Sequence, residues 1–293
     1  MKILNLGSLN IDHVYRVPHF VRPGETLAAT EFVRNAGGKG LNQSVALGRA
    51  GAPVWHAGNI GEDGLFLKTL LDASGVDTTH VEVISNATGH AVIQVDDTGQ
   101  NCILLHGGAN RSFTPEQFDR ILGKFAAGDL LLLQNEINDL EALVRKATLR
   151  DLRIVLNPSP FDRSLAGLPL ELVDTMIVNE VEAEALTGEE QLDAIIRVFH
   201  EQYPNTNLLV TLGASGACYT GKSERYSVPG RTVAAIDTTG AGDTFTGYFL
   251  AALIAGKEIA ICLAEATAAA SISVTRMGAA ASIPKRAELA SGV

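Results

Sequence analysis

The chain has 293 residues, of which 46% are hydrophobic and 19% are charged, and its formal net charge is −10. Its mean hydropathy is +0.15 and its isoelectric point is near 5.2. This length and composition predict one large domain, spanning 1–293, with a sizeable core. The acidic balance argues against nucleic acid or an acidic membrane as a partner, because either would need a basic face.

The cysteines and the apolar segments indicate the compartment. Cys102, Cys218 and Cys262 lie far apart and form no metal-binding spacing, so we expect buried, reduced thiols. No apolar run reaches the length of a signal peptide or a membrane span. We therefore expect a cytoplasmic protein with no membrane partner.

Short apolar runs alternate with helix-like stretches along most of the chain. This pattern predicts an α/β fold with a mainly parallel sheet between helices. The expected strands are residues 3–7, 54–57, 130–133, 154–156, 176–178 and 208–211.

Polar residues follow these strands at short distances: Asn10 and Asp12, Glu136, Asn157, Asn179 and Ser215. Loops are polar in any protein, but the repeated Asn, Asp and Glu within two or three residues of a strand favour a site. Ligands of open parallel sheets bind beyond the carboxyl ends of the strands. We therefore expect one shared site, collected from distant segments.

Two stretches, about 11–35 and 89–106, break this rhythm with alternating β-branched and polar residues around turn signals. They predict a small β-sheet inserted in the α/β core. An edge hairpin without function is one interpretation. A lid over the site is favoured, because the first stretch leads directly into the glycine-rich loop at Gly38 and Lys39. An exposed strand edge on such a lid makes a homodimer through the lid our expectation.

The glycine-rich segment 35–51 enters a helix that carries Lys39, Asn42 and Gln43 on its first turns. A lysine and an asparagine at such a helix start can hold hydroxyls or an anion through side chains and backbone amides. The alternative is an ordinary capped helix start exposed to solvent.

The segment 236–256, IDTTGAGDTFTGYFLAALIAG, places Asp243 at the mouth of an apolar helix. Gly240 and Gly242 allow backbone N–H groups to approach an anion there. Taken alone, the segment fits a helix cap and a tight turn as well as it fits an active site.

The segment from Gly216 to Ser223, GACYTGKS, matches the P-loop pattern in letters only. A P-loop opens a helix, whereas Lys222 and Ser223 are followed by a strand-like run that contains Pro229 and Gly230. We therefore expect a hairpin turn at this point. The run GAGDTFTG also lacks dinucleotide-binding spacing, since its third glycine, Gly247, comes too late.

Together, GGKGLNQSVALGRAG and DTTGAGDTFTGYFLAAL resemble the two glycine signatures of the ribokinase (PfkB-type) family of carbohydrate kinases, and the resemblance covers essentially the whole chain. TLGASG resembles the nucleotide-binding strand end of that family, and NEVEAEALTG resembles its NxxE motif. The resemblance implies a three-layer α/β/α fold with a small β-sheet lid. It also implies transfer of the γ-phosphate of ATP to a sugar, with the 5-hydroxyl of D-ribose as the leading acceptor.

The resemblance further assigns roles by position. Asp243 would be the base, and the amides of Gly240, Ala241 and Gly242 would form the anion hole. The sugar would be bound by Asn10, Asp12, Gly38, Lys39, Asn42, Glu136 and Asp243. These residues offer the donors and acceptors that vicinal hydroxyls need.

The resemblance likewise implies the cofactor sites. ATP would contact Asn179, Thr211, Leu212, Gly213, Ala214, Ser215, Gly216, Gly242 and Thr267, and Glu182 would hold Mg²⁺ through water. An activating K⁺ would lie at Asp237, Thr239, Ser273, Arg276, Gly278 and Ser282, mostly on backbone carbonyls.

Other functions remain open from the sequence. The acceptor can instead be another pentose, a ketohexose such as fructose, or a nucleoside. Tyr15, Arg16 and His19 in the lid segment either tune this choice or face solvent. A sensor without catalysis is disfavoured, because a sensor does not need a carboxylate facing a phosphate site.

Overall fold

A nine-stranded sheet forms the centre of the computed structural model, which describes residues 1–162, 165 and 167–290. The strand order is β13-β12-β11-β10-β9-β8-β1-β4-β5, and neighbours from β11 to β5 run parallel. The bounds are β1 Ile3–Leu6, β4 Val54–Ile60, β5 Asp77–Val83, β8 Leu130–Gln134, β9 Arg153–Asn157, β10 Thr175–Asn179, β11 Asn207–Thr211, β12 Ala217–Thr220 and β13 Arg225–Val228. All six expected strands lie in this sheet.

The segment that imitates a P-loop is a hairpin. β12 and β13 pair antiparallel, with Thr220 opposite Arg225, so Lys222 and Ser223 lie in the turn between them. The rejection of a P-loop is therefore confirmed.

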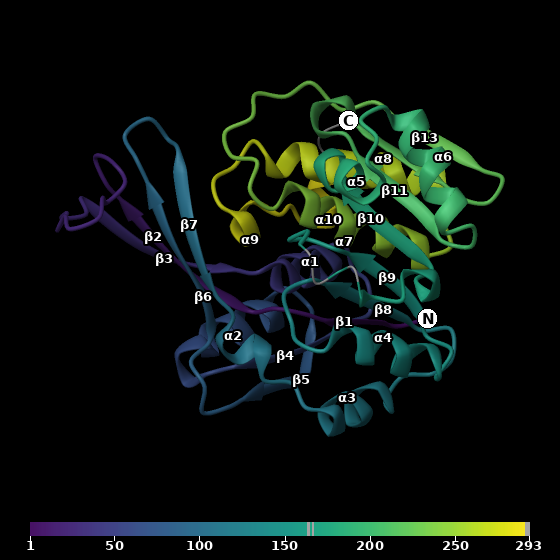
Figure 1. Ribbon diagram of the computed structural model, residues 1–293, viewed down its shortest axis with the longest axis horizontal. Coiled ribbons are helices and arrows are strands. Elements are labelled where there is room, and N and C mark those ends of the chain that lie inside the picture. Colours follow the sequence, from purple (N-terminus) through teal and green to yellow (C-terminus); the bar gives the residue numbers. More distant parts are fainter. Residues whose placement is uncertain (163–164, 166, 291–293) are drawn as a thin grey trace.

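Helices cover both faces of the sheet, and the layers are visible in Figure 1. Ile3, Leu130 and Leu132 pack with one core cluster, under α1, α2, α7 and α8; the alternate residues of the same strands pack with the other, under α3 to α6. This two-residue period is what a sheet buried on both faces requires. The helix bounds are α1 Lys39–Arg49, α2 Leu65–Ala73, α3 Pro115–Leu122, α4 Leu140–Thr148, α5 Glu180–Thr187, α6 Leu192–Gln202, α7 Ala241–Ile254, α8 Ile259–Ser273, α9 Ala279–Ser282 and α10 Arg286–Ala290.

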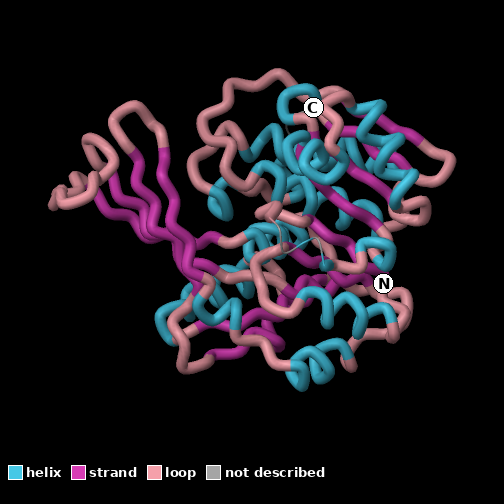
Figure 2. Tube along the Cα trace, viewed as in Figure 1, coloured by secondary structure: helices cyan, strands magenta, loops and turns pink. Residues whose placement is uncertain are grey.

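A second, four-stranded sheet projects from this body as a separate ribbon (Figure 2). Its order is β3-β2-β6-β7, and its strands are β2 Asn10–Arg16, β3 Glu31–Gly37, β6 Gly89–Val95 and β7 Asn101–His106. We refer to this sheet as the lid sheet. It is inserted after β1 and after β5, so the chain enters and leaves it at the edge of the central sheet where the site is expected.

One expectation about the cysteines is wrong. Cys218 and Cys262 are buried free thiols, but Cys102 is exposed on β7 of the lid sheet. The run from 101 to 106 is apolar in its centre, yet β7 is an edge strand and all six of its residues are exposed. Among the described residues, no helix is both long and apolar enough to cross a bilayer.

Candidate active site

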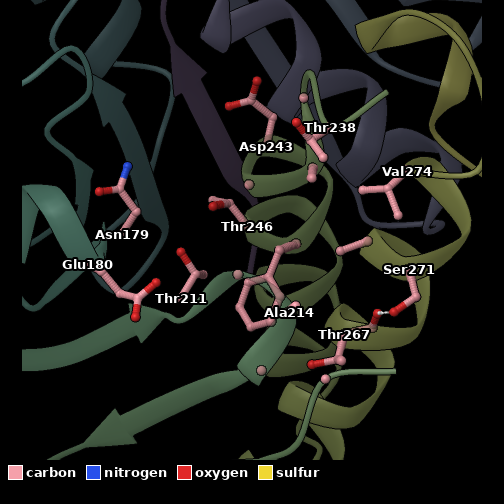
Figure 3. A pocket seen from close by; sticks show the side chains of 18 of the residues that line it. Asn179, Glu180, Thr211, Ala214, Thr238, Asp243, Thr246, Thr267, Ser271 and Val274 are labelled. Carbon is pink, nitrogen blue, oxygen red and sulfur yellow. Dashed lines mark hydrogen bonds between the residues drawn. The ribbon is translucent and has the colours of Figure 1, made fainter. Parts of the chain in front are cut away.

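A cavity of about 660 Å³ opens at the carboxyl ends of β10 and β11. Its walls come from these strand ends, the first turn of α7 and one face of α8. In Figure 3, Asp243 lies at one end of the cavity and Thr267 toward the other, with Asn179, Glu180 and Thr211 across from them. The volume is within the range of small-molecule and cofactor sites.

Asp243 is a site carboxylate rather than a helix cap. The N-cap of α7 is Gly240, which adopts a left-handed backbone with φ 75°. The Asp243 side chain instead accepts one hydrogen bond from Asn42 Nδ2 and one from Gln43 Nε2, each at 2.9 Å. Only 7% of Asp243 is exposed. The two glycine-rich segments, about 200 residues apart, therefore meet at this carboxylate.

The proposed anion hole lies on the first turn of α7, where N–H groups lack intrahelical acceptors. Gly240, Ala241 and Gly242 all line the cavity beside Asp243. The Ala241 amide donates a long hydrogen bond of 3.2 Å to the Thr238 carbonyl within the turn. An anion at this helix start would also meet the positive end of the helix dipole.

The start of α1 carries a cluster of charges beside Asp243. Glu136 accepts hydrogen bonds from the Lys39 amide, at 2.9 Å, and from the Ser8 hydroxyl. Burial raises the pKa of Glu136, although its hydrogen bonds and Lys39 oppose the shift. Burial would lower the pKa of Lys39, but Asp243, Glu136 and Glu182 raise it above its usual value. Lys39 is thus a firmly protonated cation between three carboxylates.

The remaining residues of the predicted sugar set lie where β2 leaves the body. Asn10 Oδ1 accepts from Asn110 Nδ2 at 2.7 Å, which fixes the Asn10 amide. Burial, reinforced by Glu136, raises the pKa of Asp12 to about 6. Gly38 has φ 92°, and a Cβ there would lie 3.0 Å from the Asn10 amide nitrogen, so the loop passes close to β2. The structure therefore brings the predicted sugar residues together next to Asp243.

Most of the predicted nucleotide residues line the cavity, but two do not. The lining residues are Asn179, Thr211, Gly213, Ala214, Gly216, Gly242 and Thr267. Leu212 packs against the hydrophobic core instead. Ser215 closes the short turn through its amide and lies outside the cavity lining. The turn needs glycine at Gly216, where φ is 111° and a Cβ would lie 1.9 Å from the Val228 carbonyl.

The two named residues of the NxxE pattern, Asn179 and Glu182, also have a structural role, because they cap a helix. Asn179 and Glu182 form a capping box at the start of α5: the Glu182 amide donates to Asn179 Oδ1 at 2.9 Å, and the Asn179 amide donates to Glu182 Oε2 at 3.1 Å. The other Glu182 oxygen accepts from the Ser159 hydroxyl. Glu182 is nevertheless among the residues that line the cavity.

The residues predicted to hold a monovalent cation are not among those that line the cavity. Asp237 joins two segments, since its carboxylate accepts from the Thr239 amide at 2.9 Å and from the Gly278 amide at 2.8 Å. The remaining members, Ser273, Arg276 and Ser282, follow on α8, the loop after it and α9. The Arg276 side chain pairs with Glu288. Over residues 1–162, 165 and 167–290, no cluster of three His, Cys, Asp or Glu side chains is placed to hold a metal ion.

Some features of the site were not predicted. Gln43 and Asn157 were noted in the sequence, but only the fold shows that Gln43 Nε2 donates to both Asp243 and Asn157. Ala270, Ser271 and Val274 line the cavity with Thr267. They stand three, four and seven residues after Thr267, so the helical period could have found them.

Tyr15 packs on Phe32, Arg16 pairs with Glu31 and His19 pairs with Glu25, all on the surface of the lid sheet.

A carboxylate beside a helix start, at the end of a nucleotide-sized cavity in a layered α/β/α protein, is an arrangement that suits a phosphotransferase. Comparison with known proteins defines the family. The model of the pfkB family carbohydrate kinases matches residues 1–286. The chain therefore belongs to the pfkB family of carbohydrate kinases, and it is a sugar kinase with a ribokinase-like fold.

Individual relatives agree over nearly the full length. The ribokinase of Haemophilus influenzae is 40% identical, and the alignment covers 97% of this chain and 95% of that protein. The structure of a Cryptococcus neoformans ribokinase in complex with ADP has a TM-score of 0.88 at 34% identity and covers 100% of this chain and 99% of that one. The Arabidopsis thaliana ribokinase complexed with ribose and ATP has a TM-score of 0.87 at 29% identity, covering 99% and 97%.

Proposed function

We propose that this sugar kinase is a ribokinase, which transfers the γ-phosphate of ATP to the 5-hydroxyl of D-ribose. The observation that carries the proposal is the Asp243 carboxylate, held by Asn42 and Gln43 between the cavity and the cluster of sugar residues. The similarity to ribokinases, one of them complexed with ribose and ATP, supports the choice of substrates.

In this proposal Asp243 accepts the proton of the attacking hydroxyl, while the first-turn amides of α7 stabilise the charge that develops on the transferred phosphoryl group. Phosphoryl transfer depends mainly on positioning and charge stabilisation, so a weak base is sufficient. The Lys39 ammonium adds a positive charge close to Asp243 and Glu136.

The sugar site would consist of Asn10, Asp12, Gly38, Lys39, Asn42 and Glu136. One atom supports this directly. Asn42 Oδ1 is buried and, among the described residues, has no hydrogen-bond partner, although Asn42 Nδ2 is bound to Asp243. A buried acceptor without a partner is costly, and a sugar hydroxyl would satisfy it.

ATP would occupy the cavity between Asn179 and Thr267. Thr267 Oγ1 is likewise a buried hydroxyl with no partner in the described part of the chain. It lies on the α8 side of the cavity, where the adenine ring of ATP would lie. Glu182 and Glu180 both line the cavity, and their carboxylates fit a Mg²⁺ ion that is bound through water. Mg²⁺ would neutralise phosphate charge, while Glu182 orients its water shell.

A K⁺ ion would be held by carbonyl oxygens around Asp237, Thr239, Ser273, Arg276, Gly278 and Ser282. Asp237 already ties the loop before α7 to the loop after α8. A cation at this place would fix the position of Gly240 and hence of the anion site.

The lid sheet would cover the sugar, since β2 carries Asn10 and Asp12 at its base. We further propose that two copies associate through their lid sheets, because the edge strand β7 exposes Ile103, Leu104 and Leu105. A cytoplasmic location fits an enzyme that consumes ATP.

A sugar panel tests the proposed substrate. The purified protein, with ATP and Mg²⁺, is assayed for ADP release with D-ribose, 2-deoxy-D-ribose, D-fructose and inosine, each with and without K⁺. We expect the highest kcat/KM with D-ribose, and a higher rate with K⁺. A higher kcat/KM with another acceptor would reassign the substrate, and saturable binding without ADP release would indicate a sensor.

A further inference from the structure

Two consecutive residues of α1 hold the Asp243 carboxylate, one on each oxygen. Asn42 Nδ2 donates to Oδ2 and Gln43 Nε2 donates to Oδ1, both at 2.9 Å. Asn42 belongs to the proposed sugar site, whereas Gln43 is fully buried behind Asp243, with 0% exposure. Gln43 is therefore placed to act on the base without contacting the sugar.

Both the nitrogen and the oxygen of the Gln43 side-chain amide are hydrogen-bonded. Its Nε2 donates to Asp243 Oδ1 and to Asn157 Oδ1, each at 2.9 Å, and its Oε1 accepts from Gln134 Nε2 at 2.7 Å. An ionised carboxylate only accepts hydrogen bonds, so the nitrogen of the Gln43 amide must face Asp243. Gln134 and Asn157 then leave the amide no second orientation with equal hydrogen bonding.

This contact is the end of a buried polar network that crosses the sheet. Gln134 Nε2 also donates to Asn5 Oδ1 at 3.0 Å, Asn5 Nδ2 donates to Ser44 Oγ at 2.8 Å, and Ser44 Oγ lies 2.7 Å from His56 Nδ1. Four adjacent strands, β9, β8, β1 and β4, thus each contribute one residue. His56 is fully buried, and burial lowers its pKa to about 3, so the network ends in a neutral ring.

The cost of this network argues for a role beyond packing. Buried amides stabilise a fold little compared with apolar residues of the same shape, and an unsatisfied one is destabilising. Here Gln134 Oε1 is buried and has no partner among the described residues. A polar network that keeps an unpaired acceptor below a reactive carboxylate is the arrangement expected of a support that fixes the geometry of that carboxylate.

We propose that Gln43 is a positioning residue, which holds the Asp243 carboxylate in the orientation that faces the acceptor hydroxyl, with Gln134 and Asn157 locking the Gln43 amide. The proposal rests on the role of Asp243 as base in the proposed function. Without the hydrogen bond from Gln43, the Asp243 carboxylate group could rotate away from this orientation. A small misplacement of a reacting group can lower a rate by about 100-fold.

Other charged groups also lie near Asp243. They are the Lys39 ammonium, at the start of α1, and the Glu136 carboxylate, after β8. Both remain in place when Gln43 is changed, so a change in the pH profile can be attributed to the lost hydrogen bond.

Two substitutions test the proposal in the full-length enzyme with D-ribose and ATP. In Gln43→Met, which keeps the length but not the donors, we expect kcat to fall about 10- to 100-fold with KM for the sugar within about threefold. We expect the acidic limb of kcat to move up by about one pH unit, because a lost hydrogen bond disfavours the charged form. In Gln43→Glu the limb should move further, since two adjacent carboxylates hold a proton more tightly than one, and activity should recover at high pH.

The matched control is another buried amide pair, Asn59 and Gln117, where Gln117 Nε2 donates to Asn59 Oδ1 at 2.7 Å. Gln117→Met and Gln117→Glu should lower Tm while leaving the pH profile of kcat unchanged. If the Gln43 variants behave in the same way, Gln43 is only structural and the proposal is wrong.

Asp243→Asn separates this proposal from the base role. If Asp243→Asn turns over at near the normal rate, the base role itself fails. If it is inactive while the Gln43 variants keep normal kcat and pH profiles, only the positioning role fails. Should Gln43→Met not fold, Gln134→Met replaces it; removing the donor to Gln43 Oε1 should lower kcat with KM unchanged, and a normal kcat would contradict the proposal.

Discussion

At the scale of single residues, the site combines carboxylates whose environments differ. Asp243 has two amide donors, whereas Asp12 is mostly buried beside Glu136, and its pKa is raised to about 6. A carboxylate in such a place costs stability, which fits the sugar-binding role proposed for Asp12. The sequence indicated which residue types gather here, because strand ends carry them. It did not indicate that Gln43, one residue from Asn42, faces the base, since neighbouring helix residues normally diverge.

The raised pKa of Asp12 gives a prediction for stability against pH. The folded chain binds this proton more tightly than the unfolded chain, so the free energy of unfolding falls as pH rises from about 4 to about 6 and stays lower above. Asp12→Asn removes the ionisation. We expect it to raise the free energy of unfolding at pH 8 by roughly 1–3 kcal/mol, with little change near pH 4, while KM for the sugar increases.

Urea unfolding at several pH values, with sugar KM measured in parallel, checks this. A variant that is destabilised equally at pH 5 and pH 8 would show that Asp12 contributes hydrogen bonds to the fold rather than a buried charge.

At the scale of elements, the close packing of α1 on α7 brings the two glycine-rich segments together. A Cβ at Gly247 would lie 2.4 Å from Ala46 Cβ and 2.9 Å from the Leu47 amide nitrogen, so only glycine permits this approach. The strands were predictable because buried parallel strands are continuous apolar runs. The contact between α1 and α7 was not predictable, because nothing in the sequence around Gly247 indicates which helix packs against it.

Gly247→Ala should therefore weaken both the fold and the site. We expect the free energy of unfolding to fall by about 1–3 kcal/mol through overpacking against backbone, and kcat to fall because Asn42 and Gln43 move away from Asp243. Gly242→Ala is the stability control on the same helix, since nothing lies within 4 Å of its Cβ position. Differential scanning calorimetry should show a lower Tm for Gly247→Ala only; equal Tm values would contradict this account of the helix contact.

At the scale of the whole molecule, the lid sheet is the part that stands away from the body (Figure 1). It presents apolar side chains to solvent: Leu104 is 71% exposed and Ile103 is 51% exposed on its edge strand. The sequence predicted a small β-layer from alternation, but alternation does not reveal an edge strand, and the spacing of the cysteines gave no sign that Cys102 lies exposed on one. The proposed association of two copies rests on this surface and not on the site.

Leu104→Glu should dissociate the expected dimer, because it places a charge in an apolar contact. The wild-type protein should sediment as a dimer at micromolar concentration and the variant as a monomer. Leu149→Glu is the control, since Leu149 is 86% exposed after α4, outside the lid sheet. A monomeric wild type, or a Leu104→Glu variant that remains a dimer, would contradict the proposed interface.

The central claim is that Asp243, at the start of α7, accepts the proton during phosphoryl transfer. The most direct measurement is the turnover of Asp243→Asn with D-ribose and ATP, together with its affinity for ADP. We predict that kcat falls by about 10²- to 10⁴-fold while the Kd for ADP and the Tm stay close to wild type. A variant that keeps near-normal turnover would show that the carboxylate does not act as the base.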